Sequence, residues 1–220
     1  EQDTRRFADF CRIPVFDPSS PEEAYKMIGD AFEYSEKYNT PVLFRPTTRV
    51  CHAYASIDNC DSPSPKKFEG FVKDSKKWVI FPRLSFANHI MIEKRNVEIG
   101  KDFSTYSANK AEGGNSAKAV VTSGISYAYT KECLKDYPDV KLIKIATAYP
   151  FPEDFVLSSL EGAKEVLCIE ELSPFIEEQI LKLAGKHGLQ LKVSGKLDGM
   201  VQAGGENSTD KIAAILGEFL

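Results

Sequence analysis

The chain has 220 residues, of which 42% are hydrophobic, and its formal net charge at pH 7 is −4. This length and composition suffice to bury a sizeable core without disulfide staples. The acidic balance, with a pI near 5.5, argues against a nucleic-acid partner, because neutralising phosphates requires an excess of Lys and Arg on one surface. The apolar runs are far shorter than the roughly 20 residues that cross a bilayer, so no membrane segment is predicted.

The five cysteines lie far apart and form no C-x-x-C pair: Cys11, Cys51, Cys60, Cys133 and Cys168. Such an odd, dispersed set is typical of a reduced, cytoplasmic protein, and it lacks the close thiolates that zinc or iron–sulfur modules need. No metal site is therefore predicted. Cys51 is adjacent to His52, but catalytic partners meet in space, so Cys51 is predicted to be a semi-buried apolar residue. The start of the chain, EQDTRRF, has no methionine, which suggests a piece of a longer protein.

Residues 1–58 are predicted to form the end of an α/β unit. A short strand is expected at 12–16. The S-x-x-E capping box at 20–23, with proline at the first helical position, predicts the start of a helix of about five turns. The apolar run at 42–45 then predicts a short buried strand of the kind found in parallel sheets.

A polar loop follows that strand. Arg45 and Arg49 suit a bidentate grip on a carboxylate or phosphate, and Thr47, Thr48 and His52 add further polar groups. An ordinary solvated loop has equal weight on composition alone.

Residues 59–116 are predicted to form an arm between two domains. Residues 61–101 carry nine Lys or Arg against five Asp or Glu, whereas the rest of the chain carries nineteen against twenty-seven. The arm could be a basic surface for an acidic partner, but a solvated connector is favoured. In that connector, four side chains would pack on a neighbouring surface: Trp78, Phe81, Leu84 and Phe86. A short helix is expected at 87–99 and a flexible joint at the Gly-rich 110–116.

Residues 117–220 alternate four times between strand and helix patterns. Strands are predicted at 119–123, 140–146, 165–171 and 189–193. This alternation predicts an α/β domain with a parallel sheet covered on both faces. Two helices should bury apolar stripes, which are Ile176, Ile180, Leu183 and Ala184 in one and Ile212, Ile215, Leu216 and Phe219 in the other.

Two turns and one acidic run are candidates for chemistry in this domain. The glycine of VVTSGIS and the Gly-rich segment 194–208 with Lys196 could hold an anion or simply turn the chain, so an independent nucleotide-binding domain stays an alternative. The acidic run comprises Glu165, Glu170, Glu171, Glu177 and Glu178. These carboxylates could do acid/base work or favour a helix dipole, and an interdomain contact is expected for Glu170 and Glu171. No catalytic residue is assigned.

Several stretches together resemble one family: EQDTRRFADFCRIPVFDPSSPEEAY, TPVLFRPTTRVCH, GFVKDSKKWVIFPR, SGISYAY, AYPFPED, EELSPFIEEQI and GKLDGM. They are similar to the alpha subunit of indolepyruvate ferredoxin oxidoreductase, a thiamine-diphosphate-dependent 2-oxoacid:ferredoxin oxidoreductase. The resemblance runs over essentially the whole chain but matches only the middle of such a subunit.

The resemblance implies an α/β fold in which a transketolase C-terminal-like parallel-sheet domain, residues 117–220, follows part of the thiamine pyrimidine-side domain, residues 1–58. It places Arg5, Arg49 and His52 on the side facing the cofactor and the carboxylate of the oxoacid. For the parent protein it implies oxidative decarboxylation of an aryl pyruvate to an acyl-CoA.

The same resemblance implies thiamine diphosphate, magnesium and [4Fe-4S] clusters in the parent protein. Its expected partners are a beta subunit, ferredoxin, coenzyme A and aryl pyruvate, and a homodimer is one expected assembly. The family's Gly-Asp-Gly motif is reduced here to Asp198-Gly199, and the cluster cysteines are missing. The segment alone is therefore expected to bind no cofactor and to be inactive, and a non-catalytic scaffold is the main alternative.

Overall fold

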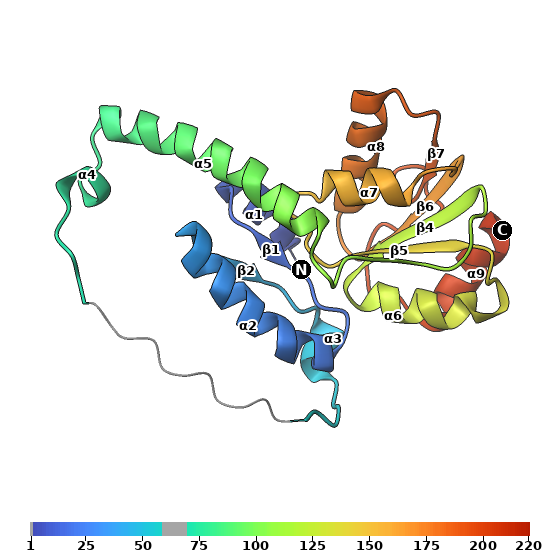
Figure 1. Ribbon diagram of the computed structural model, residues 1–220. Coiled ribbons are helices and arrows are strands. Elements are labelled where there is room, and N and C mark those ends of the chain that lie inside the picture. Colours follow the sequence, from blue (N-terminus) through green and yellow to red (C-terminus); the bar gives the residue numbers. More distant parts are fainter. Residues whose placement is uncertain (1, 59–69) are drawn as a thin grey trace.

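In the computed structural model, residues 2–58 and 70–220 are described; Cys60 and the first part of the predicted arm lie outside these ranges. The first elements are α1 (Thr4–Cys11), β1 (Val15–Phe16), α2 (Pro21–Tyr38), β2 (Leu43–Phe44), α3 (Thr48–His52), α4 (Ser75–Trp78) and α5 (Pro82–Ser104). They form the N-terminal part and the long helical arm at the left of Figure 1.

The remaining elements build a layered α/β unit. They are β3 (Lys110–Glu112), β4 (Lys118–Ser123), α6 (Gly124–Cys133), a 3₁₀ turn (Leu134–Asp136), β5 (Lys141–Ile145), α7 (Glu153–Ser159), β6 (Glu165–Ile169), α8 (Phe175–His187), β7 (Lys192–Ser194) and α9 (Thr209–Phe219). The sheet order is β3-β5-β4-β6-β7, in which β3 is antiparallel to β5 and the other pairs are parallel. The predicted α/β class is confirmed, with one antiparallel edge strand added.

Both faces of this sheet are covered, as the alternating pattern predicted. Helices α7 and α8 lie on one face and α6 and α9 on the other (Figure 1). Every predicted stripe residue of α8 is buried, and in α9 only Ile215 is partly exposed. Strands buried on both faces need apolar residues at successive positions, which explains the continuous run Val166–Ile169.

The N-terminal part packs against one corner of this unit. Strands β1 and β2 are parallel, and Val15 also bridges Tyr149 of the C-terminal part. Phe16 lies in an aromatic cluster and meets the rings of Tyr34 and Phe103 edge-on at centroid distances of 5.4 and 5.3 Å. Such edge-to-face pairs stabilise packing beyond simple area burial. The cluster thereby ties β1 to both α2 and α5.

Four local predictions differ from the structure. The strand expected at 12–16 covers only Val15–Phe16, because Arg12 ends α1 in a left-handed conformation. The strand expected at 42–45 covers only Leu43–Phe44 and is half-buried, because β1 is the single strand that pairs with it among the described residues. The helix expected at 87–99 extends over 23 residues, since Pro82 starts it early. The strand expected at 189–193 spans Lys192–Ser194, because its pairing with β6 begins only at Lys192.

The flexible joint expected at 110–116 is also wrong. Residues 110–112 form β3, and the glycines after it lie against the backbone of the 139–140 turn. A Cβ on Gly113 would lie 2.2 Å from the carbonyl oxygen of Val140, and Gly113 has a φ of +88°. Here glycine permits a close approach in a left-handed conformation rather than flexibility.

Candidate functional site

A cavity of about 1110 Å³ lies where the N-terminal part meets the carboxyl edge of the five-stranded sheet. It is lined by residues 2–4, 43–48, 171–174 and 203–206 together with Cys51 and His52. In open α/β sheets, ligands bind outside the carboxyl ends of the strands where the strand order reverses. Here β5 and β6 lie on opposite sides of β4, so that reversal point is at the ends of β4 and β6, beside the cavity.

The Arg5 side chain lies at this reversal point, where it contacts the residues that follow β6. Its guanidinium donates to carboxylate oxygens of Asp3 at 2.6 Å and of Glu170 at 2.8 Å. It also donates to the main-chain oxygens of Glu171 at 2.8 Å and Ser173 at 3.1 Å. Arg5 is fully buried, and its donors already have acceptors. It therefore lies behind the residues that line the cavity, and its position on the cofactor-facing side of the parent protein stays a prediction.

Glu170 contacts the N-terminal part of the chain through Arg5. Besides the ion pair with Arg5, its carboxylate accepts the backbone N–H groups of Ile176 at 2.9 Å and Glu177 at 3.0 Å, at the start of α8. Burial raises the pKa of Glu170, and Arg5 with these N–H groups opposes that rise only in part. Burial alone would lower the pKa of Arg5, but Glu170 and Asp3 outweigh burial and raise it, which keeps the guanidinium charged.

Arg45 holds a carboxylate of this chain. Its Nη1 lies 3.1 Å from Oδ2 of Asp17, which follows β1 and is fully buried. Burial raises the pKa of Asp17, while Arg45 and Arg5 oppose the rise. A Cβ on Gly124, at the start of α6, would lie 3.1 Å from Oδ1 of Asp17, and Gly124 has a φ of +53°. The space that a phosphate would need beside the TSGIS turn is therefore taken by Asp17.

The second predicted anion loop, at 194–208, is also occupied by the chain itself. The carboxylate of Glu177 accepts the backbone N–H of Lys196 at 2.7 Å and that of Leu197 at 3.2 Å. A Cβ on Gly195 would meet Oε2 of Glu177 at 2.6 Å, so the glycine makes room for this carboxylate. The ammonium of Lys196 donates to the carbonyl oxygen of Gln202. These contacts weigh against an independent nucleotide site.

Arg49 and His52 lie on α3 at the rim of the cavity. His52 lines it, whereas Arg49 forms an ion pair with Glu206 from the loop before α9. The Arg49 side chain is 57% exposed, so this bridge lies in solvent, unlike the pairs of Arg5 and Arg45. Cys51 is exposed rather than semi-buried as predicted, because only Val50 of this short helix faces inward.

Further polar groups belong to the site, and two of them, Asp3 and Asp17, were not assigned from the sequence. Asp3 caps α1 and binds Arg5, and Asp17 anchors Arg45. Thr47 Oγ1 is buried at the cavity and has no hydrogen-bond partner within the described residues. Glu171 lines the cavity and accepts the N–H of Asn207 at 2.9 Å, and burial raises its pKa. Two sequence signals could have identified them: Asp3 directly precedes a helix, and Asp17 directly follows a strand.

Comparison with known proteins shows which proteins this chain is similar to. The chain is 37% identical over 204 residues to indolepyruvate oxidoreductase subunit IorA of Thermococcus kodakarensis, covering 89% of this chain and 32% of the relative. It is 35% identical over 203 residues to IorA of Methanothermobacter thermautotrophicus, covering 90% and 33%. This chain is homologous to part of IorA. The resemblance seen in the sequence is confirmed, and the chain spans about one third of the length of these IorA subunits.

The chain shares its fold with a solved protein structure. A solved 2-oxoglutarate:ferredoxin oxidoreductase from Magnetococcus marinus aligns with a TM-score of 0.58 and 14% identity, covering 93% of this chain and 42% of that chain. No protein-family profile matches the chain. Among the described residues, no helix has the length and apolar character to span a membrane. In those same ranges, no three His, Cys, Asp or Glu side chains gather in a way that could hold a metal ion.

Proposed function

We propose that this chain is the segment of an indolepyruvate:ferredoxin oxidoreductase subunit that forms one wall of the oxoacid site. In this assignment residues 1–58 end the pyrimidine-side domain, residues 59–116 are the interdomain arm and residues 117–220 are the transketolase C-terminal-like domain. The observation that carries the proposal is the cavity at the junction of the first and last of these regions, combined with similarity to IorA over nine-tenths of the chain.

The parent reaction would release carbon dioxide from an aryl pyruvate, transfer the acyl group to coenzyme A and pass two electrons to ferredoxin through [4Fe-4S] clusters. Thiamine diphosphate, when bound, supplies the carbanion chemistry of such a decarboxylation. The residues present do not fit its diphosphate or magnesium, because Glu170 and Glu177 already occupy the backbone N–H groups at the sheet edge and Asp17 lies beside α6. We assign the diphosphate and the clusters to other parts of the parent protein.

The contribution of this chain is to bind and orient the oxoacid carboxylate. Arg49 is suited to this because its present acceptor, Glu206, is in solvent, and exposed ion pairs exchange at little cost. His52 and the unpartnered hydroxyl of Thr47 supply further polar groups on the same wall. Arg5 and Arg45 hold buried carboxylates and act as positioning residues. In this proposal the parent works in the cytoplasm with a beta subunit and ferredoxin.

The test uses the full-length subunit that carries this segment, purified with its beta subunit, in an assay of ferredoxin reduction dependent on indolepyruvate and coenzyme A. Arg49→Met and His52→Gln should each lower kcat/KM for indolepyruvate about tenfold or more, chiefly through KM, because a charge-assisted contact with the carboxylate is lost. His187→Gln, at the end of α8 away from the cavity, is the matched control. Unchanged KM values in both rim variants would refute the assignment.

A non-catalytic scaffold is the second candidate, and the buried contacts of Arg5 across the two parts favour it. Calorimetric titration of the 220-residue chain with thiamine diphosphate and magnesium separates the alternatives for the segment itself. Micromolar binding would contradict the scaffold hypothesis. It would also contradict the inference that Glu170 and Glu177 leave no backbone N–H groups at the sheet edge for a diphosphate. Thermal stabilisation by an adenine nucleotide would instead support the independent nucleotide-binding alternative.

A further inference from the structure

Leu172 has a left-handed backbone conformation at the wall of the cavity. It lies between β6 and α8, and its φ is +63°. Among the described residues, the other non-glycine residues with a positive φ are Arg12 and Asn39, which end α1 and α2. Left-handed residues are common at helix ends, but for a bulky residue elsewhere this conformation is a costly outlier. Leu172 ends no helix, so its conformation has another cause.

Contacts from the N-terminal part hold the backbone on both sides of Leu172. Nη2 of Arg5 donates to the main-chain oxygen of Glu171 at 2.8 Å and to that of Ser173 at 3.1 Å. The backbone N–H of Ser173 donates to Oδ2 of Asp3 at 3.1 Å. Strained backbone persists where surrounding contacts determine it in this way, and such residues cluster at functional sites. Asp3 and Arg5 therefore fix the direction in which the Leu172 side chain leaves the backbone.

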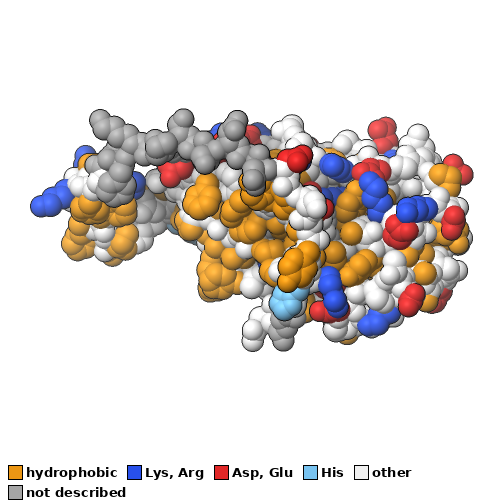
Figure 2. Space-filling view, turned by 90° about the horizontal axis from the view of Figure 1, so that it is seen from below, with side chains coloured by type: hydrophobic (Ala, Val, Ile, Leu, Met, Phe, Trp, Pro, Cys, Tyr) orange, Lys and Arg blue, Asp and Glu red, His pale blue; other side chains and the backbone are white. Residues whose placement is uncertain are grey.

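The Leu172 side chain is not part of the core. It is half-buried and belongs to none of the three apolar core clusters that the described residues form. It lines the cavity, whereas the apolar residues Leu43 and Phe44 of the same wall pack on two of those clusters. Apolar side chains are common at the surface of this chain, and Figure 2 shows many across the middle of the molecule. Leu172 differs from them because a costly backbone conformation presents it to the cavity.

Stability alone favours glycine at this position, since glycine adopts a positive φ without steric cost. What leucine adds is an apolar surface in the cavity. An aryl pyruvate has a carboxylate at one end and an apolar ring at the other. The carboxylate is proposed to bind Arg49 and His52 on α3, while Leu172 comes from a different element, the loop between β6 and α8. The apolar surface that the ring needs is thus supplied by Leu172.

We propose that Leu172 is a specificity-determining residue that contacts the aryl group of the oxoacid, and that Asp3 and Arg5 position it. This inference rests on the proposed oxoacid site. A small oxoacid such as pyruvate has no ring and does not reach the leucine. Removing the leucine side chain therefore weakens the binding of aryl substrates and leaves that of pyruvate unchanged.

The test compares Leu172→Ala and Leu172→Gly in the full-length subunit, purified with its beta subunit. Both variants should lower kcat/KM for indolepyruvate about tenfold or more, because lost apolar contacts in a pocket change discrimination by about 10–200-fold. The inhibition constant of pyruvate, added as a competitor of indolepyruvate, should stay within about twofold of its original value. The assay is ferredoxin reduction dependent on indolepyruvate and coenzyme A.

The same two variants measure the strain at Leu172. Alanine keeps the Cβ that makes a positive φ costly, whereas glycine lacks it. The urea midpoint of the 220-residue chain should therefore be about 0.5 M higher for Leu172→Gly than for Leu172→Ala. Asn39→Gly and Asn39→Ala are the matched controls, because Asn39 has a φ of +48° and does not line the cavity. They should show the same order of midpoints and leave kcat/KM for indolepyruvate unchanged.

The combined results separate this inference from the proposed function. Suppose that Arg49→Met and His52→Gln raise KM while both Leu172 variants leave kcat/KM for indolepyruvate within about twofold. The specificity assignment is then overturned and the oxoacid site stands. If only the Leu172 variants act, the carboxylate assignment fails and the aryl contact stands.

Two other results would also overturn the inference. An equal loss of affinity for indolepyruvate and pyruvate in the Leu172 variants would show a general disturbance of the site. A midpoint for Leu172→Gly no higher than that for Leu172→Ala would show that the backbone at this position is not strained.

Discussion

Replacing Arg5 by Met tests the contact that joins the two parts of the chain. The substitution leaves the carboxylates of Asp3 and Glu170 buried without their guanidinium. Removing one partner of a buried ion pair typically costs about 3–5 kcal/mol, because the remaining charge is uncompensated. Domains of this size have total unfolding free energies of about 5–15 kcal/mol, so the variant should lose about a fifth of its stability or more.

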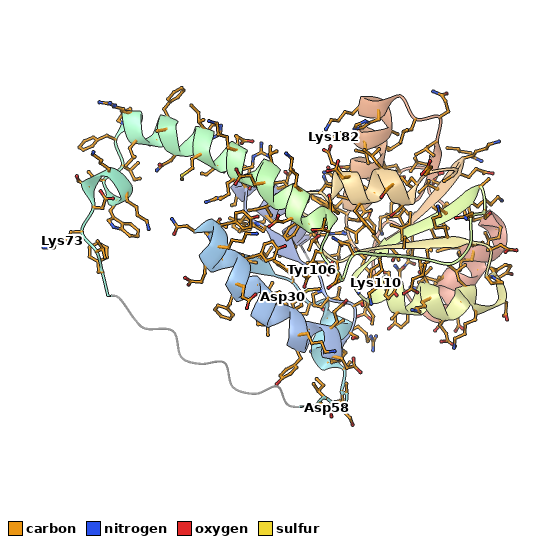
Figure 3. The ribbon with its side chains drawn as sticks, in the orientation of Figure 1. Asp30, Asp58, Lys73, Tyr106, Lys110 and Lys182 are labelled. Atoms are coloured by element: carbon orange, nitrogen blue, oxygen red, sulfur yellow. The ribbon has the colours of Figure 1, made fainter. Side chains whose placement is uncertain are left out.

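The assay is urea unfolding at pH 7 followed by far-UV circular dichroism. With an m value of about 2 kcal/mol/M, the midpoint should fall by about 1.5–2.5 M. Glu170→Gln in the Arg5→Met background should recover part of the loss, because it removes the unpaired charge while its amide oxygen still accepts one of the two N–H groups of α8. Lys182→Met, on the exposed side of α8, is the control and should change stability by less than about 0.5 kcal/mol (Figure 3). A loss below about 1 kcal/mol for Arg5→Met would refute the reasoning.

Three further predictions concern packing and protonation, each measured by thermal or urea unfolding. Gly195→Ala should lower the free energy of unfolding by about 1–3 kcal/mol, because the new Cβ displaces the Glu177 carboxylate. Gly185→Ala is the control: a Cβ there meets nothing within 4 Å, so the substitution should stabilise α8 by up to about 1 kcal/mol. Equal effects of the two substitutions would contradict the close approach of Glu177 to Gly195. Because the pKa of Glu171 is raised in the folded chain, its ionisation is destabilising, and stability is lost as pH rises through the folded pKa. Glu171→Gln should therefore stabilise the chain more at pH 7 than at pH 4. The same stability difference between variant and original chain at both pH values would contradict the raised pKa. Asn109→Ala should lower the free energy of unfolding by about 1–3 kcal/mol. The Asn109 amide oxygen accepts the N–H of Ala146 at 2.7 Å, and the amide nitrogen donates to the Phe103 carbonyl and the Thr147 hydroxyl. An unchanged stability would mean that water replaces the amide at these three groups.

Local rules predicted the local structure well. The capping box at the start of α2 is present, with Ser20 Oγ accepting the N–H of Glu23 at 3.2 Å. The carboxylate of Glu23 departs from the usual box by accepting from the N–H and hydroxyl of Ser19, one residue earlier. Both contacts lie within five residues, so the sequence pattern alone contains the signal.

Contacts between distant segments were not predictable in this way. The Gly-rich pattern after β3 predicts a flexible joint, because the neighbouring backbone at 139–140 comes close only once the sheet is assembled. The ion pair of Arg5 is not predictable for the same reason, since its acceptor Glu170 lies 165 residues away. An arginine near a candidate site has the same sequence signal whether it binds a ligand or a carboxylate of its own chain.

At the carboxyl edge of the sheet, the contacts show which charged side chains bind groups of their own chain. The backbone N–H groups that commonly bind phosphates at such edges are occupied here by Glu170 at α8 and by Glu177 at the 195–197 turn. Arg5 neutralises Glu170 at the reversal point of the strand order. Because these partners are buried, a ligand anion could displace them only by leaving a buried charge unpaired, which costs several kcal/mol. In the proposed oxoacid site the carboxylate would therefore be held by exposed side chains, and Arg49 is proposed for this because its acceptor Glu206 lines the cavity and their ion pair lies in solvent.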